Sequence, residues 1–192
     1  MLETESRMKE HVASDLNQRI AQRVRDLRAA RGLSLEAAAT KSGVSRSMIS
    51  LIERGESSPT AVVLERLATG LGVAMASLFD APQPQATPLA RAKEQPPWRD
   101  PQSGYVRRNV SPGGAGSPIQ IVEVSFPAGA RVAYETGPRE PRVHQQIWVQ
   151  EGSIDVTVGD ERHRLQAGDC LALVLDQPLL YHNPTRKPAR YA

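Results

Sequence analysis

The stretch that decides the first half of the fold is "LSLEAAATKSGVSRSMISLIERG", residues 33–55. It holds two short helical segments, each opened by a serine and closed by a glycine. Ser34 and Ser45 are expected N-caps, because a serine hydroxyl can accept a hydrogen bond from the backbone N–H groups that a helix start leaves unpaired. Gly43 and Gly55 are expected stops, since glycine readily adopts the left-handed conformation that ends many helices. The sequence therefore predicts a helix, a tight turn and a second helix.

The second of these helices has two different faces. The polar side holds Arg46, Ser47, Ser50 and Arg54, and the packed side holds Met48, Ile49 and Ile52. A helix of this kind can enter the major groove of DNA, where an arginine can donate two hydrogen bonds to one guanine.

Apolar residues at helical spacing extend the pattern on both sides. Those at positions 16, 20, 24 and 27 predict a helix over 16–32. Ser58 is the expected cap of a helix over 58–72, with Pro59 at its first position, where the missing N–H costs nothing. Residues 74–80 predict a last short helix, and residues 1–14 are expected to form a disordered tail.

The segment from Val24 to Leu78 closely resembles the helix-turn-helix domain of the phage-repressor class, the Cro/C1 or XRE type. The similarity rests on an ordered set of features: Ala38, Gly43, Ser45, the inward Ile49 and Ile52, and then "ERGE", "SPT" and "LATGLGV". The resemblance implies an all-α, five-helix, lambda-repressor-like DNA-binding domain over 15–80, with its core at 24–78. It also implies binding to operator DNA as a homodimer.

The resemblance further implies DNA-binding roles for seven residues. Those expected nearest the base edges are Ser45, Arg46, Ser47 and Ser50, and the expected contacts of the DNA backbone are Ser34, Arg54 and Thr60. The best-known repressors of this class carry glutamines where this chain has Leu35 and Arg46. The operator sequence therefore cannot be transferred from them.

The second half of the chain has a different pattern. Residues 81–101 are rich in proline and are expected to be an extended linker, with Trp98 packing on the domain that follows. Over 102–192, short runs separated by Gly, Pro and Asp predict strands at 105–110, 119–126, 131–135, 146–150, 153–158, 161–165, 170–175 and 179–183. Gly159 and Asp160 are a two-residue hairpin signal. The sequence predicts a second, all-β domain, a sandwich or barrel.

The block "VQEGSIDVTVGDERHRLQAGDCLAL", residues 149–173, resembles a cupin. The resemblance implies a double-stranded β-helix, or jelly-roll, barrel. A barrel of this kind behind a phage-repressor type helix-turn-helix resembles a common bacterial group of small-molecule-responsive transcription regulators.

Cupin enzymes usually hold a metal through two motifs, and neither is filled in this chain. The first motif, anchored on Gly152, places its glutamate at Gln145, and its histidine pair falls within 139–142, which holds no histidine. The second places its histidine at Leu179, although its asparagine matches Asn183. We therefore expect no metal, no other cofactor and no enzyme activity. A metal-dependent cupin enzyme fused to a DNA-binding domain is the alternative, as is a barrel that serves only for dimerisation.

His144 and His182 lie one and three positions away from the ligand slots. Because side-chain direction alternates along a strand, both are expected to point away from the barrel interior. Trp148 should also face outward, which makes it a candidate for a dimer interface. Cys170 is expected to be a small buried core residue.

An interior without metal ligands is expected to bind a small-molecule effector. The candidate effector-binding residues are Arg131, Tyr134, Arg142, Gln145, Ile147, Leu179 and Tyr181.

Charge and composition set the partners and the compartment. The formal net charge is +3, but residues 15–54 hold eight Lys or Arg against four acids, an excess that suits double-stranded DNA. No apolar run is long enough to span a membrane and the N-terminus lacks a signal peptide's apolar segment, so a cytoplasmic protein without a membrane partner is expected.

Overall fold

The computed structural model describes residues 2–80, 87–113, 117–137 and 142–192, and of residues 2–14 only the backbone. These residues form two compact units: Met1–Trp98 with Arg108–Gln120, and Arg99–Arg107 with Ile121–Ala192. The division differs from the boundary expected near residue 101, because residues 108–120 group with the helices. No helix in the described part of the chain is both long and apolar enough to cross a membrane.

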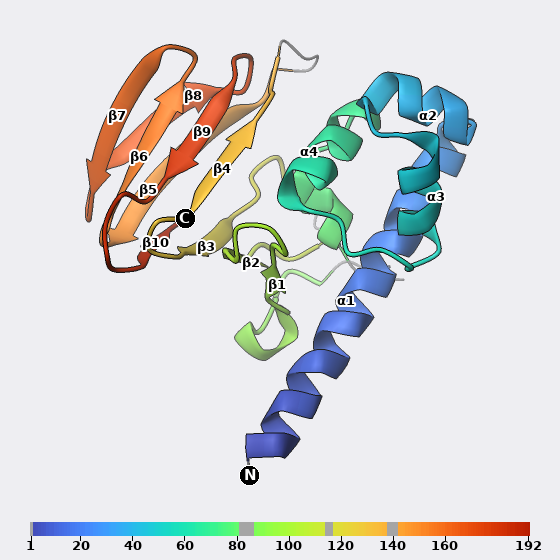
Figure 1. The fold of residues 1–192 in the computed structure, drawn as a ribbon, viewed down its shortest axis with the longest axis horizontal. Helices are drawn as coiled ribbons and strands as arrows, with labels where there is room; N and C mark the ends of the chain where they lie inside the picture. Colours follow the sequence, from blue (N-terminus) through green and yellow to red (C-terminus); the bar gives the residue numbers. More distant parts are fainter. Residues whose placement is uncertain (1, 81–86, 114–116, 138–141) are drawn as a thin grey trace. The chain divides into compact units, whose positions relative to one another are not determined.

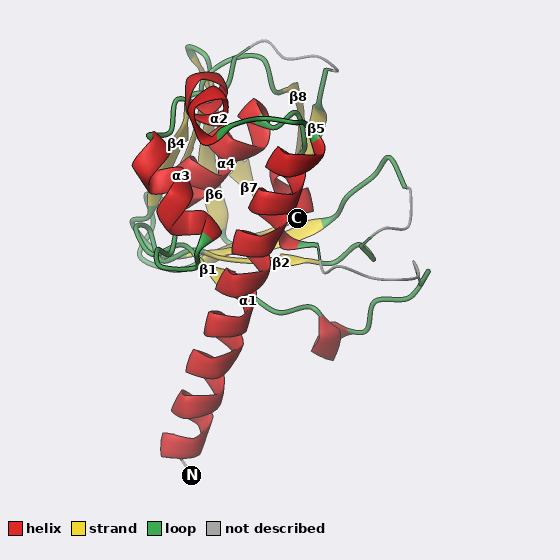
Figure 2. Cartoon of the chain, turned by 90° about the vertical axis from the view of Figure 1, so that its right-hand side faces the viewer, coloured by secondary structure: helices red, strands yellow, loops and turns green. Residues whose placement is uncertain are grey.

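The first unit is helical (Figures 1 and 2). Its helices are α1 (Leu2–Ala30), α2 (Leu35–Ser42), α3 (Arg46–Glu53), α4 (Ala61–Gly70) and the short 3-10 helices η1 (Met75–Phe79) and η2 (Ala92–Glu94). Apolar side chains from α1, α3, α4 and η1 meet in a single core, in which Ile20, Ile49, Leu64 and Leu78, among others, have no exposed surface. The helical periodicity read from the sequence is thus the periodicity of burial.

The expected caps of the helix pair are confirmed. The Ser34 hydroxyl accepts a hydrogen bond from the backbone N–H of Ala37 at 3.1 Å, and the Ser45 hydroxyl accepts one from Met48 at 3.2 Å. Gly43 has a φ of 67°, and its N–H donates to the Ala39 carbonyl, which closes α2. A side chain at this φ would be strained, so glycine sets the angle of the turn.

Two expectations for the flanking helices differ from the structure. The N-cap of α4 is Thr60 and not Ser58, because Thr60 is the extended residue directly before the helix and its hydroxyl accepts from Val63. The Ser58 hydroxyl accepts instead from the side-chain amide of Asn17. α1 begins at Leu2, where a disordered tail was expected; neither glycine nor proline interrupts the chain before Gly32.

The close approach of α4 to α2 depends on Gly70. A Cβ at this position would lie 2.7 Å from both Cα and Cβ of Ser42, nearer than real Cβ contacts come. Glycine is therefore needed for the packing of these two helices.

The strands form a β-sandwich of two sheets, and all but parts of β1 and β2 belong to the second unit. The described strands are β1 (Trp98–Arg99), β2 (Val106–Asn109), β3 (Val122–Phe126), β4 (Arg131–Tyr134), β5 (His144–Glu151), β6 (Ser153–Val158), β7 (Glu161–Gln166), β8 (Cys170–Val174), β9 (Leu179–His182) and β10 (Ala189–Tyr191). One sheet has the order β1-β2-β3-β10-β5-β8 and the other β4-β9-β6-β7. All eight expected strands are present. The additional β1 and β10 are too short to show a clear alternation.

Alternation along the strands sets which side chains are inside. Ile147, Val149, Ile154 and Val156 have no exposed surface, whereas Trp148 between two of them is 51% exposed, as expected. β6 and β7 form the expected hairpin, with Val158 paired to Glu161 across Gly159 and Asp160.

Cys170 corrects an expectation, because it is exposed and not buried. It pairs in register with Trp148, and β8 is the edge strand of its sheet. Residues paired across two strands share a face, so Cys170 lies on the outer face with Trp148.

The Trp98 ring is buried as expected, but against a different partner. It packs edge-on against Phe79 with the ring centres 5.5 Å apart, and both residues belong to the helical unit. The linker residues 81–86 lie outside the described residues.

Candidate nucleic-acid interface and barrel interior

The first turn of α3 presents polar groups to solvent. Ser45, Arg46 and Ser47 are exposed, while Ile49 and Ile52 on the opposite side are buried. Ser45 and Ser47 also share a hydrogen bond between their hydroxyls, 3.2 Å apart. The guanidinium at the start of the helix is thus held on a rigid, anchored element and faces outward.

Three of the seven candidate DNA-binding residues act as helix caps. The hydroxyls of Ser34, Ser45 and Thr60 accept bonds from the first turns of α2, α3 and α4. Each cap satisfies one backbone N–H and leaves others at the helix start, which are suited to bind phosphate oxygens.

Arg54 is already engaged within the helical unit. Its Nε and Nη2 each lie 2.8 Å from a carboxylate oxygen of Glu56, and its Nη1 donates to the Ser50 hydroxyl at 2.5 Å. The pairing lowers the pKa of the Glu56 carboxyl and raises that of Arg54. Arg54 thus links the candidate residue Ser50 to the Glu56 carboxylate, which lies beside both of them.

Sequence reasoning missed the ion pair that holds α3 in place. Arg28 of α1 donates to both carboxylate oxygens of Glu53, at 2.6 and 2.9 Å, and also to the Leu33 carbonyl at 2.7 Å. Arg25 donates to the Glu53 carbonyl at 2.8 Å. The Glu53 side chain is only 6% exposed. The sequence signal that could have indicated this ion pair is Glu53 itself, a charged residue at the end of α3, one position after the buried Ile52.

The interior of the β-sandwich is aromatic and carries several hydroxyls. The Gln145 amide donates to the Tyr181 hydroxyl at 2.9 Å, and the hydroxyls of Tyr105 and Tyr134 lie 3.2 Å apart. The rings of Tyr181 and Tyr191 are stacked, with centres 5.8 Å apart. Burial raises the pKa of Tyr105 and raises those of Tyr134 and Tyr191 still further, so these hydroxyls stay protonated.

The structure brings together five of the seven candidate effector-binding residues. Those on the inner faces of β4, β5 and β9 are Tyr134, Gln145, Ile147, Leu179 and Tyr181. Arg131 and Arg142 are exposed. Arg131 cannot share the inner face with Tyr134, because residues three apart on a regular strand point to opposite sides.

The sequence analysis also missed three interior residues. Tyr105, Arg107 and Tyr191 are buried in the same unit. Tyr105 directly precedes β2, Arg107 lies on β2 and Tyr191 lies on β10. Their strands are short, and their burial depends on distant pairing partners.

The interior donors do not fit a divalent cation. Of the ligand slots in the described part of the barrel, those at Gln145 and Leu179 hold no metal-ligating side chain, and burial raises the pKa of the Tyr134 and Tyr191 phenols so that they stay protonated. The histidine-pair slots at 139–141 lie outside the described residues. His144 is exposed on the outer side of β5, and His182 pairs in register with Arg131 and Asp155 on the outer face of the smaller sheet. Among the side chains the structure describes, no three His, Cys, Asp or Glu converge.

Asn183, which matches the second cupin motif, ties the β9–β10 loop to the end of β3. Its amide donates to the carbonyls of Phe126 and Lys187, and its carbonyl oxygen accepts from the backbone and hydroxyl of Thr185. The residue is fully buried. Its part in the barrel is therefore structural.

Known proteins resemble the chain over most of its length. The helix-turn-helix family HTH_3 matches residues 24–78. The HTH-type transcriptional regulator SutR of Escherichia coli (strain K12) is 31% identical over 160 residues, which cover 83% of this chain and 84% of SutR. The HTH-type transcriptional regulator PuuR of the same organism is 25% identical over 162 residues, covering 84% and 85% of the two chains. The crystal structure of an HTH_3 family transcriptional regulator from Vibrio cholerae has a TM-score of 0.76 at 29% identity and covers 93% of this chain and 96% of that one.

Proposed function

Because the chain belongs to the HTH_3 helix-turn-helix family of DNA-binding transcriptional regulators, we propose that it is a one-component regulator whose operator affinity is set by a small molecule. In this proposal the helical unit reads operator DNA as a dimer, and the interior of the cupin-type sandwich binds the effector.

The exposed start of α3 supports the assignment of the DNA-reading residues. Arg46 reads a guanine from the major groove, and Ser45, Ser47 and Ser50 lie nearest the base edges. Ser34, Thr60 and Arg54 contact the DNA backbone, where the starts of α2 and α4 supply N–H donors. For Arg54 this contact requires the guanidinium to leave Glu56, so we expect a weaker contribution from Arg54 than from Arg46.

The dimer is supported by the size of the DNA-binding module. One helix-turn-helix unit buries about 600–1,000 Å² on DNA and binds weakly at physiological salt. Two units joined in one protein can occupy two half-sites about one helical turn apart, which multiplies affinity.

The proposed effector site is supported by a few polar groups that lie among the buried apolar side chains of the sandwich interior. Tyr181, Tyr134 and the Gln145 amide supply a small number of hydrogen-bonding groups beside the buried Ile147 and Leu179, the composition typical of small-molecule sites. The groups are neutral and the interior donors do not fit a metal, so the interior suits a binder better than a metal-dependent enzyme. The relatives named above are transcriptional regulators.

The DNA assignment is tested with Arg46→Ala on the protein's own promoter and on random DNA. We expect a loss of roughly tenfold or more on the promoter and a much smaller loss on random DNA, because a bidentate arginine discriminates by about 1–3 kcal/mol. The matched control is Arg186→Ala, an exposed arginine of the other unit, which should change neither affinity. Equal losses on both DNAs would show that Arg46 contacts only phosphate.

The effector assignment is tested by thermal shift with amino acids, amines and small carboxylates. A binder at 100 times its dissociation constant adds about 2.7 kcal/mol to the free energy of unfolding. Tyr181→Phe, which removes the hydroxyl that Gln145 contacts, should weaken the response of any binder found. A flat response across the library would favour a barrel used only for assembly, and stoichiometric tightly bound iron, manganese or zinc would favour the enzyme alternative.

A further inference from the structure

The outer face of the smaller sheet carries charges in ordered rows. The pairing registers place Arg131, His182, Asp155 and Arg164 side by side across β4, β9, β6 and β7, which we call the basic row. A second row crosses the same four strands two residues away from the basic row. It consists of Ala133, Leu180, Thr157 and Arg162, and we call it the middle row. A third row lies two residues beyond the middle row, just past the ends of the paired strands. It consists of Glu135, which follows β4, and Asp160 in the β6–β7 turn, and we call it the acidic row.

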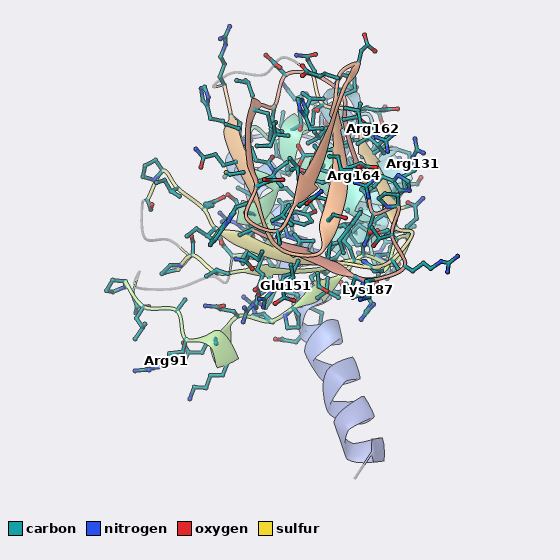
Figure 3. The ribbon with its side chains drawn as sticks, turned by 90° about the vertical axis from the view of Figure 1, so that its left-hand side faces the viewer. Arg91, Arg131, Glu151, Arg162, Arg164 and Lys187 are labelled. Carbon is teal, nitrogen blue, oxygen red and sulfur yellow. The ribbon has the colours of Figure 1, made fainter. Side chains whose placement is uncertain are left out.

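Exposure follows the same alternation. Arg131, Arg164, Glu135 and Asp160 are exposed, while Val132 and Thr136 on the opposite side of β4 are buried. In Figure 3, the labelled Arg131, Arg162 and Arg164 lie over the strands of this sheet, and Lys187 lies apart from them. The two ends of one sheet face therefore carry opposite charge.

The middle row contains one charge, and a buried carboxylate holds it. Arg162 donates from Nη2 to Asp155 at 2.5 Å, and the Asp155 side chain is 3% exposed. The pair draws the guanidinium of Arg162 toward the basic row. The middle row is otherwise small or apolar, with Leu180 and Thr157 on its two central strands.

We propose that this face is an interface between two copies of the chain, stacked face to face about a two-fold axis that runs along the middle row. Such an axis reverses strand direction and lays β4 over the partner's β4 and β7 over the partner's β7. Arg131 then meets the partner's Glu135, and Arg164 meets the partner's Asp160. Leu180 meets its own copy, and Arg162 is neutralised by Asp155 where two like charges would otherwise face each other.

The charge pattern favours a second copy over DNA as the occupant. Residues 99–107 and 121–192 hold ten Lys or Arg and ten Asp or Glu, so the second unit has no net charge to attract a polyanion. The acidic row would also repel phosphates that approach the basic row, about 13 Å away along the strands. A surface with both signs in register is complementary to itself.

The proposal rests on the dimer of the proposed function and is tested by exchanging charges in the full-length chain. The variants are Arg164→Glu, Asp160→Arg and the two combined, and sedimentation equilibrium measures the dimer dissociation constant at low salt. Each single change is expected to raise the constant about tenfold or more, because a two-fold dimer contains every pair twice. The double variant restores it to within roughly threefold, since the exchanged charges still face each other. Lys187→Glu, an exposed cation outside the three rows, is the matched control and should leave the constant unchanged.

Thermal unfolding of each variant separates misfolding from dissociation. If the turn at Asp160 does not tolerate arginine, the pair of changes Arg131→Glu and Glu135→Arg repeats the charge exchange on β4. The proposal is overturned if the double variant loses as much dimer stability as the two single variants together. It is also overturned if the wild-type chain is a monomer. An Arg164→Glu variant that stays dimeric but binds DNA more weakly and with a lower salt dependence would assign the face to phosphate, while the dimeric regulator itself would stand.

Discussion

Removing Arg28 should destabilise the helical unit far more than removing its partner Glu53. The Glu53 carboxylate is 6% exposed and accepts two bonds from Arg28, whose own side chain is 19% exposed. Arg28→Met leaves a buried charge unpaired, which costs about 3 kcal/mol. Glu53→Gln keeps one acceptor and lets the guanidinium reach water, so it costs only about 1 kcal/mol. The double variant Arg28→Met/Glu53→Met should recover most of the loss, because no buried charge remains.

The assay is urea unfolding followed by circular dichroism at 222 nm, which reports the helical unit because the described part of the second unit contains no α-helix. The same variants should lose promoter affinity in the order of their stability, since the pair fixes α3 against α1. Equal losses in the two single variants, together with additive losses in the double, would refute the idea of a buried and coupled pair.

Three further outcomes follow from packing, hydrogen bonding and burial. Gly70→Ala should cost about 2 kcal/mol or more in the helical unit, measured by the same denaturation, because its Cβ would overlap the backbone of Ser42. Asn183→Ala should lower the unfolding free energy of the barrel by about 3 kcal/mol, measured by tyrosine fluorescence, as four hydrogen bonds are lost in a fully buried site. Burial raises the pKa of Asp80 despite two nearby arginines, so its contribution to stability is present at low pH and lost as pH rises through that pKa. Asp80→Asn should therefore gain a few tenths of a kcal/mol at pH 7 after solvent screening, with the gain disappearing below about pH 4.

The helix-turn-helix could be predicted because its signals are local. A cap lies within three residues of the N–H it satisfies, and the stop glycines set their own backbone conformation, so Ser34, Gly43 and Ser45 were readable one by one. The match of the HTH_3 family to residues 24–78 covers the same span that the sequence motifs indicated. The prediction of Ser58 as a cap was wrong, because its hydroxyl is used by the distant Asn17 and Thr60 lies directly before the helix.

The barrel residues show the other limit. Alternation alone placed Gln145, Ile147 and Tyr181 inside and His144 outside. The same rule, applied along β4, excludes Arg131 from the interior, because Arg131 lies three residues from the inward Tyr134. Cys170 was misplaced because an apolar run on an edge strand looks like a core strand in sequence.

The sequence by itself determined the elements, the turns and the inward face of each long strand, because these depend on backbone preferences and on a side-chain period of two or 3.6 residues. Only the tertiary structure decided which residues meet. It paired Arg28 with Glu53 across 25 positions, placed Tyr105 beside Tyr134 across 29, and put four strands in one register so that the basic and acidic rows share a face. Such contacts depend on the closure of long loops and on sheet order, which no local preference of the chain encodes.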